Sequence, residues 1–336
     1  MADDGAFGRR RGRVLIVAGK GGVGKTTLCT ALAGAANQCG SSALILAVEA
    51  GAGTAWQPLA SDSASTGIGS LGPSGPQSGG QGPNRRVAAG QSVFARLAAD
   101  VALAEYLDSH GLGRLSRRLV RSGVVELAAT AAPGIKDVLI LGKIRQLSER
   151  AKADLIVVDA PASGHALRFL GGPAALGRIV ASGPLREQAD EAAAMVADPD
   201  RCRALLVTVA EETAVNEAIE TGFALEDRVG IALDAVVVNG LYPHLGNLDT
   251  DGSDLDSPTI GGDEGLQAAL DEAAAFRQRR QELQQSQLRR LGDGLPLHQV
   301  RLPFLFAGTD AGLDPLVNQL GADPFMAARL RTGDSW

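Results

Sequence analysis

Short apolar runs recur along the chain and alternate with segments of helical periodicity. Runs rich in Val, Ile and Leu are typical of parallel strands that are buried on both faces. They predict strands at Arg13–Ala18, Ala43–Val48, Asp154–Asp159, Ala204–Val209, Leu233–Asn239 and Leu297–Pro303, and Ser92–Leu97 is a further strand candidate. Strands that alternate with helices predict an α/β fold, with a mostly parallel sheet flanked by helices on both faces.

The segments between these strands differ in character. Helical periodicity covers 26–40, about 98–152, which we interpret as a small inserted helical region, and a polar stretch at 266–291. Two stretches at about 60–86 and 246–265 are rich in Gly, Ser, Pro and Asp, and such composition does not bury a core. We interpret both as flexible insertions. The chain is thus expected to have a flexible N-terminus over 1–12 and one domain over 13–336.

A glycine-rich turn follows the first predicted strand and precedes the first predicted helix. Its sequence fits the phosphate-binding pattern G-x-x-x-x-G-K-[ST], and strand and helix supply the context that this pattern requires. Glycines let backbone N–H groups turn around a phosphate, and the helix N-terminus adds its positive end. The predicted nucleotide-binding residues are Gly19, Lys20, Gly21, Gly22, Val23, Gly24, Lys25, Thr26 and Thr27. Lys25 is expected to reach the β- and γ-phosphates of ATP, and Thr26 to hold Mg²⁺.

A carboxylate ends another buried strand. Asp159 closes the run "LIVVD" and precedes Ala160-Pro161. An aspartate in this position binds Mg²⁺ through water in many P-loop proteins. The alternative is that Asp159 only caps the following turn. With a phosphate-binding loop in the same chain, the magnesium role is favoured, and Lys25 and Asp159 are candidate catalytic residues.

The loop contains a second lysine, Lys20, which phosphate binding alone does not require. The segment "KGGVGKTT" resembles the deviant Walker A motif of the MinD/ParA/ArsA group of ATPases. In that group the early lysine reaches the nucleotide of the partner subunit. The resemblance therefore implies a dimer, formed with a second copy or with a paralogous subunit, in which Lys20 acts as a cation beside developing phosphate charge, like an arginine finger.

Other segments resemble the ArsA-type arsenical-pump and tail-anchored-protein-targeting ATPases. "DAPASGHALRFL" is similar to their switch II, which implies switch roles for Pro161, Gly164 and His165, although His165 could instead be a packing residue. "APGIKDVLILGKI" is similar to their helical-domain motif. "VVVNG" places Asn239 at the adenine-contacting asparagine, and "VRLPFL" places Pro303 beside the base. The overall pattern is most similar to the short actinobacterial branch, in which paired similar subunits occur.

One departure from the family pattern concerns hydrolysis. After its second strand the family has Asp-Pro-Ala-His and then a water-positioning aspartate, whereas this chain has "VEAGAGTAWQPL". Glu49 is a candidate ligand of a magnesium-bound water. Trp56 or a neighbour takes the place of the water-positioning aspartate, and no carboxylate lies between Glu49 and Asp62. Two functions stay open: an ATP-hydrolysing dimeric switch, or a catalytically weak nucleotide-binding subunit of a heterodimer.

The net charge and the cysteine spacing limit the kinds of partner and ligand that the chain is expected to bind. The formal net charge of −6 disfavours nucleic acid and hence a ParA- or MinD-like positioning role. Cys29, Cys39 and Cys202 show no clustered spacing, so neither an arsenite site nor a CxxC zinc site is predicted. No secretory signal or bilayer-spanning run is expected. We expect a cytoplasmic protein that reaches a membrane only peripherally, through a partner, and whose cargo the sequence does not name.

Overall fold

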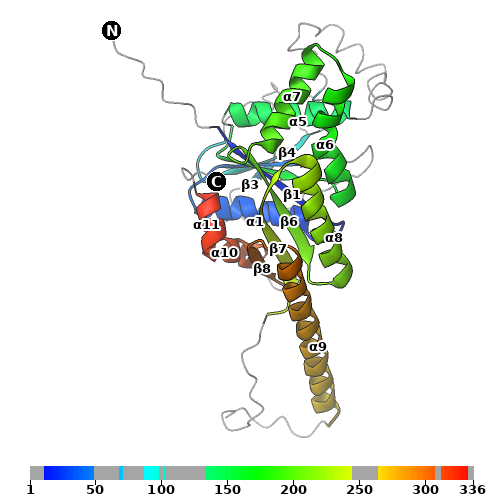
Figure 1. Cartoon of the computed structure of the whole chain (residues 1–336). Coiled ribbons are helices and arrows are strands. Elements are labelled where there is room, and N and C mark those ends of the chain that lie inside the picture. Colours follow the sequence, from blue (N-terminus) through cyan, green and yellow to red (C-terminus); the bar gives the residue numbers. More distant parts are fainter. Residues whose placement is uncertain are drawn as a thin grey trace, which may run out of the picture.

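The computed structural model describes residues 11–48, 68–70, 87–97, 102, 134–150, 152–243, 264–306 and 312–331. A sheet of parallel strands forms its centre, in the order β3-β4-β2-β5-β1-β6-β7-β8 (Figure 1). The strands are β1 (Arg13–Gly19), β2 (Ala43–Val48), β3 (Ile68–Ser70), β4 (Ser92–Leu97), β5 (Leu155–Asp159), β6 (Cys202–Val209), β7 (Ala232–Leu241) and β8 (Gln299–Pro303). The parallel sheet with flanking helices confirms the predicted α/β fold.

Helices connect the strands and cover the sheet. They are α1 (Lys25–Gln38), α5 (Ile135–Glu149), α6 (Ser163–Ile179), α7 (Pro184–Ala197), α8 (Glu212–Ala224), the π-helical turn η1 (Leu225–Val229), α9 (Glu264–Gly294), α10 (Asp314–Ala322) and α11 (Pro324–Leu330). Within the described part of the chain, none of these helices combines the length and the apolar character that a bilayer crossing requires.

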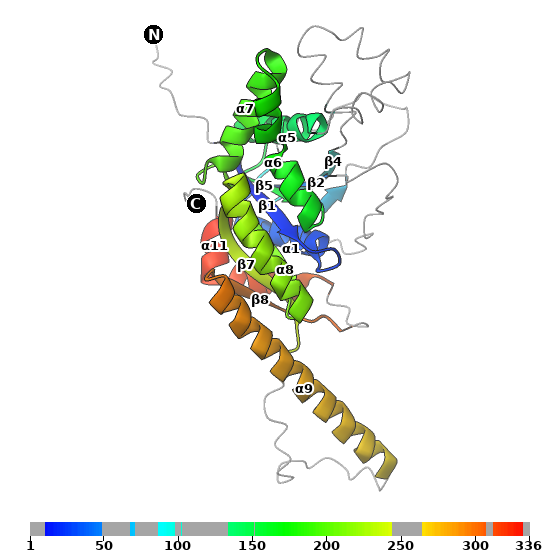
Figure 2. The ribbon, with the colours of Figure 1, turned by 45° about the vertical axis from the view of Figure 1, so that its right-hand side comes forward.

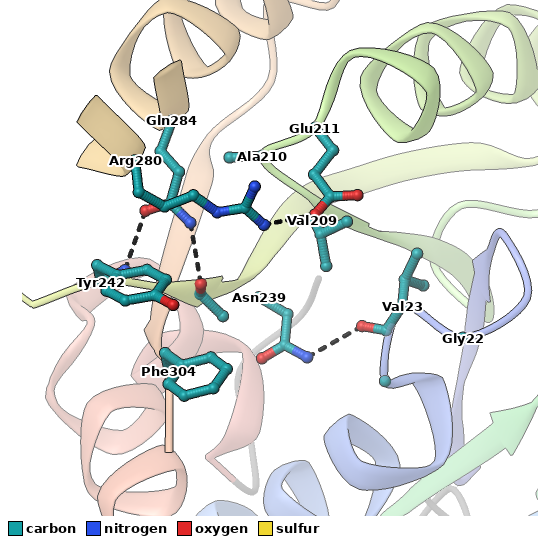
Figure 3. A pocket seen from close by; sticks show the side chains of 12 residues that line it. Gly22, Val23, Val209, Ala210, Glu211, Asn239, Tyr242, Arg280, Gln284 and Phe304 are labelled. Carbon is teal, nitrogen blue, oxygen red and sulfur yellow. Dashed lines mark hydrogen bonds and ion pairs between the residues drawn. The ribbon is translucent and has the colours of Figure 1, made fainter. Parts of the chain in front are cut away.

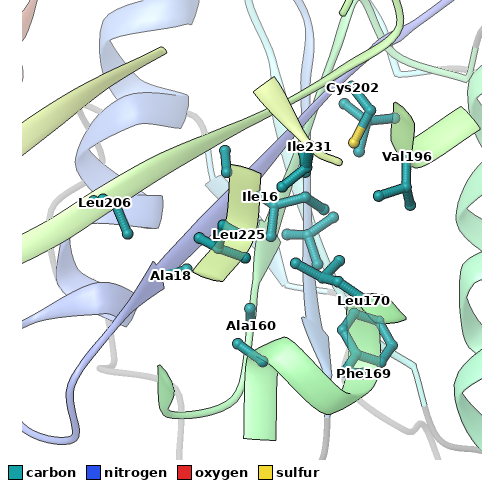
Figure 4. Packing of buried hydrophobic residues seen from close by; sticks show 14 of the residues in the cluster. Ile16, Ala18, Ala160, Phe169, Leu170, Val196, Cys202, Leu206, Leu225 and Ile231 are labelled. Carbon is teal, nitrogen blue, oxygen red and sulfur yellow. The ribbon is translucent and has the colours of Figure 1, made fainter. Parts of the chain in front are cut away.

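Each face of the sheet has its own apolar core, because successive side chains of a strand point to opposite faces. Ile16 of β1 belongs to the cluster beneath α5, α6, α7, α8 and the end of α9, which Figure 4 shows. Its neighbour Val17 belongs to the cluster beneath α1, α10 and α11. Both residues are fully buried. The continuous apolar runs of the sequence are therefore explained by a sheet that is covered on both sides.

Two predicted insertions are only partly described. Within 60–86, residues Ile68–Ser70 form β3 and pair with β4 at the edge of the sheet, and the remainder lies outside the described residues. Within 98–152, α5 packs on α6 and α7 and joins the main core through Ile140, Leu141 and Ile144. The insertion at 246–265 and the N-terminus at 1–12 lie almost entirely outside the described residues.

Helix α9 differs from the others in its position. It is 31 residues long and extends away from the sheet, with only its C-terminal part beside α8 and β7 (Figures 1 and 2). Residues 272–276 are all exposed. Phe276 and Leu283 expose 59% and 58% of their surface, which is unusual for large apolar side chains in one helix.

The parallel arrangement brings the carboxyl ends of the strands to one edge. Gly19 ends β1, which lies between β5 and β6, and Asp159 ends β5. Asn239 lies near the end of β7, where the pairing with β8 shifts register between Val238 and Leu241. Ligands of open parallel sheets bind at this edge, and the predicted site residues from three strands meet there.

Candidate functional site

The loop after β1 has the conformation that its glycines permit. Gly24 takes a left-handed φ of 95°, and a Cβ atom there would lie 2.3 Å from Nδ2 of Asn239. A Cβ atom on Gly19 would lie 2.2 Å from the carbonyl oxygen of Val207. Both approaches exclude any larger residue. Gly21 and Gly22 are exposed at the crest of the loop, and α1 begins directly after it at Lys25. The loop thus surrounds the N-terminus of a helix with backbone N–H groups, as phosphate binding requires.

Lys25 lies at the centre of this loop. Its Nζ donates hydrogen bonds to the carbonyl oxygens of Gly19 and Lys20, each at 3.0 Å. Burial lowers the pKa of Lys25, and the nearby carboxylate of Asp159 opposes that shift. The ammonium group is therefore held at the loop by two neutral acceptors, which an anionic phosphate oxygen replaces favourably.

Thr26 and Asp159 meet beside Lys25. The Thr26 hydroxyl donates to Oδ2 of Asp159 at 2.6 Å, although the two residues are 133 positions apart in the chain. Burial raises the pKa of Asp159, and the bond from Thr26 and the charge of Lys25 moderate the rise. A hydroxyl and a carboxylate oxygen are suitable ligands for a hard cation such as Mg²⁺. The structure thus brings together two of the three oxygen-bearing residues that the sequence predicted for this role.

The side chains described at this edge do not form a dedicated all-protein metal cage. Among the described residues, no group of three or more His, Cys, Asp or Glu side chains is arranged to hold a metal ion. Mg²⁺ commonly takes one or two protein ligands and completes its shell with phosphate oxygens and water. The pair of Thr26 and Asp159 fits that pattern. The third predicted ligand, Glu49, lies outside the described residues, as do Trp56 and Asp62.

Lys20 points to α8. Its Nζ lies 3.3 Å from Oε2 of Glu217, and the hydroxyl of Ser163 donates to Oε1 of the same carboxylate. The bond from Ser163, together with Lys20, lowers the pKa of Glu217. Ser163 is the first residue of α6 and follows the segment after Asp159. Glu217 therefore links the second lysine of the loop to the segment that resembles switch II.

The predicted switch residues lie at the start of α6. Pro161 precedes the helix, and Gly164 and His165 lie in its first turn. Gly164 and His165 are both exposed. His165 therefore does not pack into the core, which was the alternative that the sequence left open.

A pocket of about 260 Å³ opens beside the loop (Figure 3). It lies between the loop, the ends of β6 and β7, the segment after β8, and α9. Its lining residues are Gly22, Val23, Gly24, Val209, Ala210, Glu211, Asn239, Gly240, Tyr242, Arg280, Gln284 and Phe304. Asn239 donates through Nδ2 to the carbonyl oxygen of Val23 at 2.9 Å, so its amide is oriented by the loop itself.

Aromatic side chains form one side of the pocket. Tyr242 and Phe304 stack with ring centroids 5.3 Å apart and an angle of 11° between their planes. Phe304 follows Pro303, so the predicted residue ends β8 and its neighbour supplies the wall. Sequence reasoning missed Glu211, Tyr242, Arg280 and Gln284. Of these four residues, only Tyr242 could have been found from the sequence, because it is an aromatic residue three positions after the predicted Asn239.

The cysteines form no thiolate site. Cys29, Cys39 and Cys202 are all free, and Cys29 and Cys202 are buried. Burial raises the pKa of Cys29 well above its ordinary range and that of Cys202 to about 12. Buried neutral thiols are poor ligands for soft ions.

Comparison with known proteins adds the family. Residues 109–183 match the family model described as anion-transporting ATPase. The chain is 31% identical over 252 residues to ATPase BagA of Mycobacterium tuberculosis, an alignment that covers 69% of this chain and 66% of that protein. It is also 26% identical over 252 residues to a protein of Halobacterium salinarum named "Putative arsenical pump-driving ATPase". That alignment covers 69% of this chain and 36% of that protein. The chain thus spans just under two thirds of the first relative. Its loop, sheet and similarities place it in the ArsA-type ATPase family.

Proposed function

We propose that the chain binds MgATP at the carboxyl edge of the sheet and hydrolyses it as a dimeric switch. The observation that carries this proposal is the contact between Thr26 and Asp159 beside Lys25. Lys25 and Thr26 at the start of α1 and Asp159 at the end of β5 converge there. A phosphate-binding loop with a cation and two oxygen ligands is the arrangement that phosphoryl transfer requires. When bound, Mg²⁺ would neutralise charge between the β- and γ-phosphates.

The lining of the pocket is suited to a purine base that carries an exocyclic amino group. Nδ2 of Asn239 donates one of its two N–H groups to the carbonyl of Val23, which orients the amide so that Oδ1 can accept a hydrogen bond from a ligand. The exocyclic amine of adenine donates such a bond, whereas guanine presents an oxygen at the same place. Phe304 and Tyr242 line the pocket and cover one face of each other's ring, and the rest of their aromatic surface is offered to the base. We therefore propose ATP rather than GTP.

The dimeric part of the proposal rests on Lys20, because the resemblance of "KGGVGKTT" to the deviant Walker A motif implies that this lysine contacts the nucleotide of a partner subunit. Its ammonium is paired with Glu217 within the same chain, so it contributes no contact to the Thr26–Asp159 pair. We propose that this pair opens when two subunits close and that Lys20 then meets the γ-phosphate of the partner. Because Ser163 bonds the same carboxylate, release of Lys20 would free the start of α6 and pass the change to a partner or cargo.

The test is steady-state ATP hydrolysis and ATP binding by the wild type, Lys20→Ala and Lys25→Ala. Lys25→Ala is expected to lose ATP binding and ATP-dependent dimerisation. Lys20→Ala should keep ATP binding and lose turnover, by about 10²- to 10³-fold if it stabilises transition-state charge. Arg178→Ala, an exposed cation in the last turn of α6, is the control. Full turnover by Lys20→Ala would contradict the dimeric role.

A second function is favoured by one sequence observation, the lack of a carboxylate between Glu49 and Asp62. In that case the chain is a nucleotide-binding subunit that hydrolyses ATP only with a paralogous partner. The same assay distinguishes the two. Wild-type protein that binds ATP without turnover, and gains turnover when the paralogue is added, supports the heterodimer. Turnover by the isolated chain supports the homodimer.

A further inference from the structure

Helix α9 contributes a buried amide to the wall of the pocket. Gln284 is only 8% exposed. Its Oε1 accepts a hydrogen bond from the backbone N–H of Tyr242 at 3.0 Å, and its Nε2 donates to the carbonyl of Gly240 at 3.1 Å. One side chain thus binds the backbone on both sides of Leu241. Figure 3 shows both bonds beside Asn239.

These backbone groups lie where the sheet is irregular. Gly240 takes a left-handed φ of 71°, and the pairing of β7 with β8 shifts register between Val238 and Leu241. Backbone groups that a strand ladder does not pair need another partner when they are buried. Gln284 supplies it, and therefore determines how the segment after Asn239 presents Tyr242 to the pocket.

Neighbouring turns of α9 hold the same segment. Arg277 and Gln281 both donate to the carbonyl oxygen of Pro243, at 2.6 and 3.0 Å, and the Arg277 guanidinium lies 5.8 Å from the centroid of the Tyr242 ring. Arg280 pairs with Glu211 at the start of α8 at 2.8 Å, and both residues line the pocket. One side of α9 is therefore committed to the pocket, while the helix beyond it extends away from the body (Figure 2).

We propose that Gln284 is a positioning residue for the base and that α9 responds to whether the pocket is filled. This inference rests on the proposed function, because the base of ATP is the proposed occupant. A base that packs on Tyr242 and Phe304 restricts the segment over residues 240–243. That segment is coupled to α9 through Gln284, Gln281 and Arg277. Transient breaking of the backbone hydrogen bonds of α9 therefore becomes less favourable when the base is bound. A ligand that has phosphates but no base would leave α9 unchanged.

The first experiment compares ATP with inorganic tripolyphosphate as ligands of the full chain. Gln284→Met removes both hydrogen bonds and keeps most of the side-chain volume. Its affinity for ATP should fall about tenfold, since two backbone groups lose their partner. Affinity for tripolyphosphate, which engages only the loop, should stay within about twofold of wild type. Gln285→Met is the matched control, because Gln285 is the exposed neighbour on the same helix, and both affinities should be unchanged.

The second experiment needs no variant, so it decides the question even if Gln284→Met does not fold. Hydrogen exchange of the wild type is followed over residues 272–286 with ATP, with tripolyphosphate and without ligand. Slower exchange with ATP alone supports the inference. Equal exchange with ATP and tripolyphosphate, or an equal loss of both affinities in Gln284→Met, overturns it and leaves nucleotide binding intact. Failure of the wild type to bind either ligand overturns the proposed function, and this inference with it.

Discussion

The phosphate end and the base end of the site are built in different ways. At the phosphate end, Gly19–Thr27 form one continuous segment, and Asp159 joins it from the end of β5. At the base end, the walls come from the loop, β6, β7, α8, α9 and the segment after β8. The first depends on backbone conformation that a short motif specifies. The second depends on how separate elements pack, so it is free to differ among chains that share the loop.

The difference extends to charge. Burial lowers the pKa of Lys25 and raises that of Asp159, so the phosphate end holds two ionisable groups whose charged forms are disfavoured without a ligand. The base end is dominated by amides and rings, and its one ion pair, Arg280–Glu211, lies at the exposed rim. Phosphate binding should therefore be sensitive to charge and pH, and base binding to shape and hydrogen bonding.

The largest effect is expected at the phosphate end. Lys25→Ala removes the cation at the centre of the loop, and truncating a buried charge that contacts a ligand commonly costs about 2–5 kcal/mol. ATP and tripolyphosphate should both bind at least about 30-fold more weakly. Calorimetric titration of the two ligands measures this. A variant that lost ATP but kept tripolyphosphate would show that Lys25 serves the base end, against the division drawn above.

Acidification should affect the same end. Because burial raises the pKa of Asp159, this carboxylate takes up a proton at a higher pH than an ordinary aspartate, whose pKa is about 4. The protonated form cannot hold Mg²⁺ well. At limiting Mg²⁺, the magnesium-dependent part of ATP binding should decline on acidification, at a pH above about 4, by up to about tenfold per pH unit. In Asp159→Asn, ATP binding should not depend on Mg²⁺ and should therefore show no such decline. A decline that persisted in Asp159→Asn would mean that another group takes up the proton.

A smaller effect, confined to the base end, is expected for Asn239→Ala. It removes the amide that faces the pocket and leaves the carbonyl of Val23 without its partner at 2.9 Å. ATP should bind about tenfold more weakly, the cost of roughly one buried hydrogen bond. The preference for ATP over GTP should decrease, and tripolyphosphate should bind as in the wild type. Competition assays with the three ligands test this. An unchanged preference would mean that another group selects the base.

The smallest effect is expected for Arg280→Ala. The pair with Glu211 is exposed, since the two side chains retain 41% and 57% of their accessible surface. Exposed pairs commonly contribute about 0.2–1 kcal/mol. ATP affinity should therefore fall by no more than about fivefold, with the larger part of the loss at low ionic strength. A titration at two salt concentrations checks this, and a loss as large as that of Asn239→Ala would place Arg280 in direct contact with the base.

The same division explains what the sequence could predict. The loop and Asp159 were found because each follows an apolar run that predicts a strand, and parallel strands end at one edge. Asn239 was found through the resemblance of "VVVNG" to a family motif. Glu217 was not found, because its link to Lys20 depends on how α8 packs beside β1, and the two lie almost 200 positions apart. Gln284 was missed because it lies in a polar helix whose pattern gives no reason to prefer it over Gln285.

Two parts of the fold were also out of reach. The strand β3 has only three residues, in a stretch whose composition favours coil, and it exists because β4 offers an edge to pair with. The helices α10 and α11 cover the face of the sheet that carries α1. They have 9 and 7 residues, too few for a helical period to stand out in the sequence. Tertiary pairing, rather than local preference, decides such elements.

The length of α9 has a geometric consequence. About 20 residues separate Gln284 from the start of the helix, a distance of about 30 Å at 1.5 Å per residue. A tilt of about 10° at Gln284 would carry the far end through about 5 Å, roughly one helical turn. The pocket-lining residues Arg280 and Gln284 thus lie nearer the C-terminal end of the helix, and the part before them is a long arm. It would enlarge an adjustment of less than an ångström beside the base into a movement that a neighbouring molecule can follow.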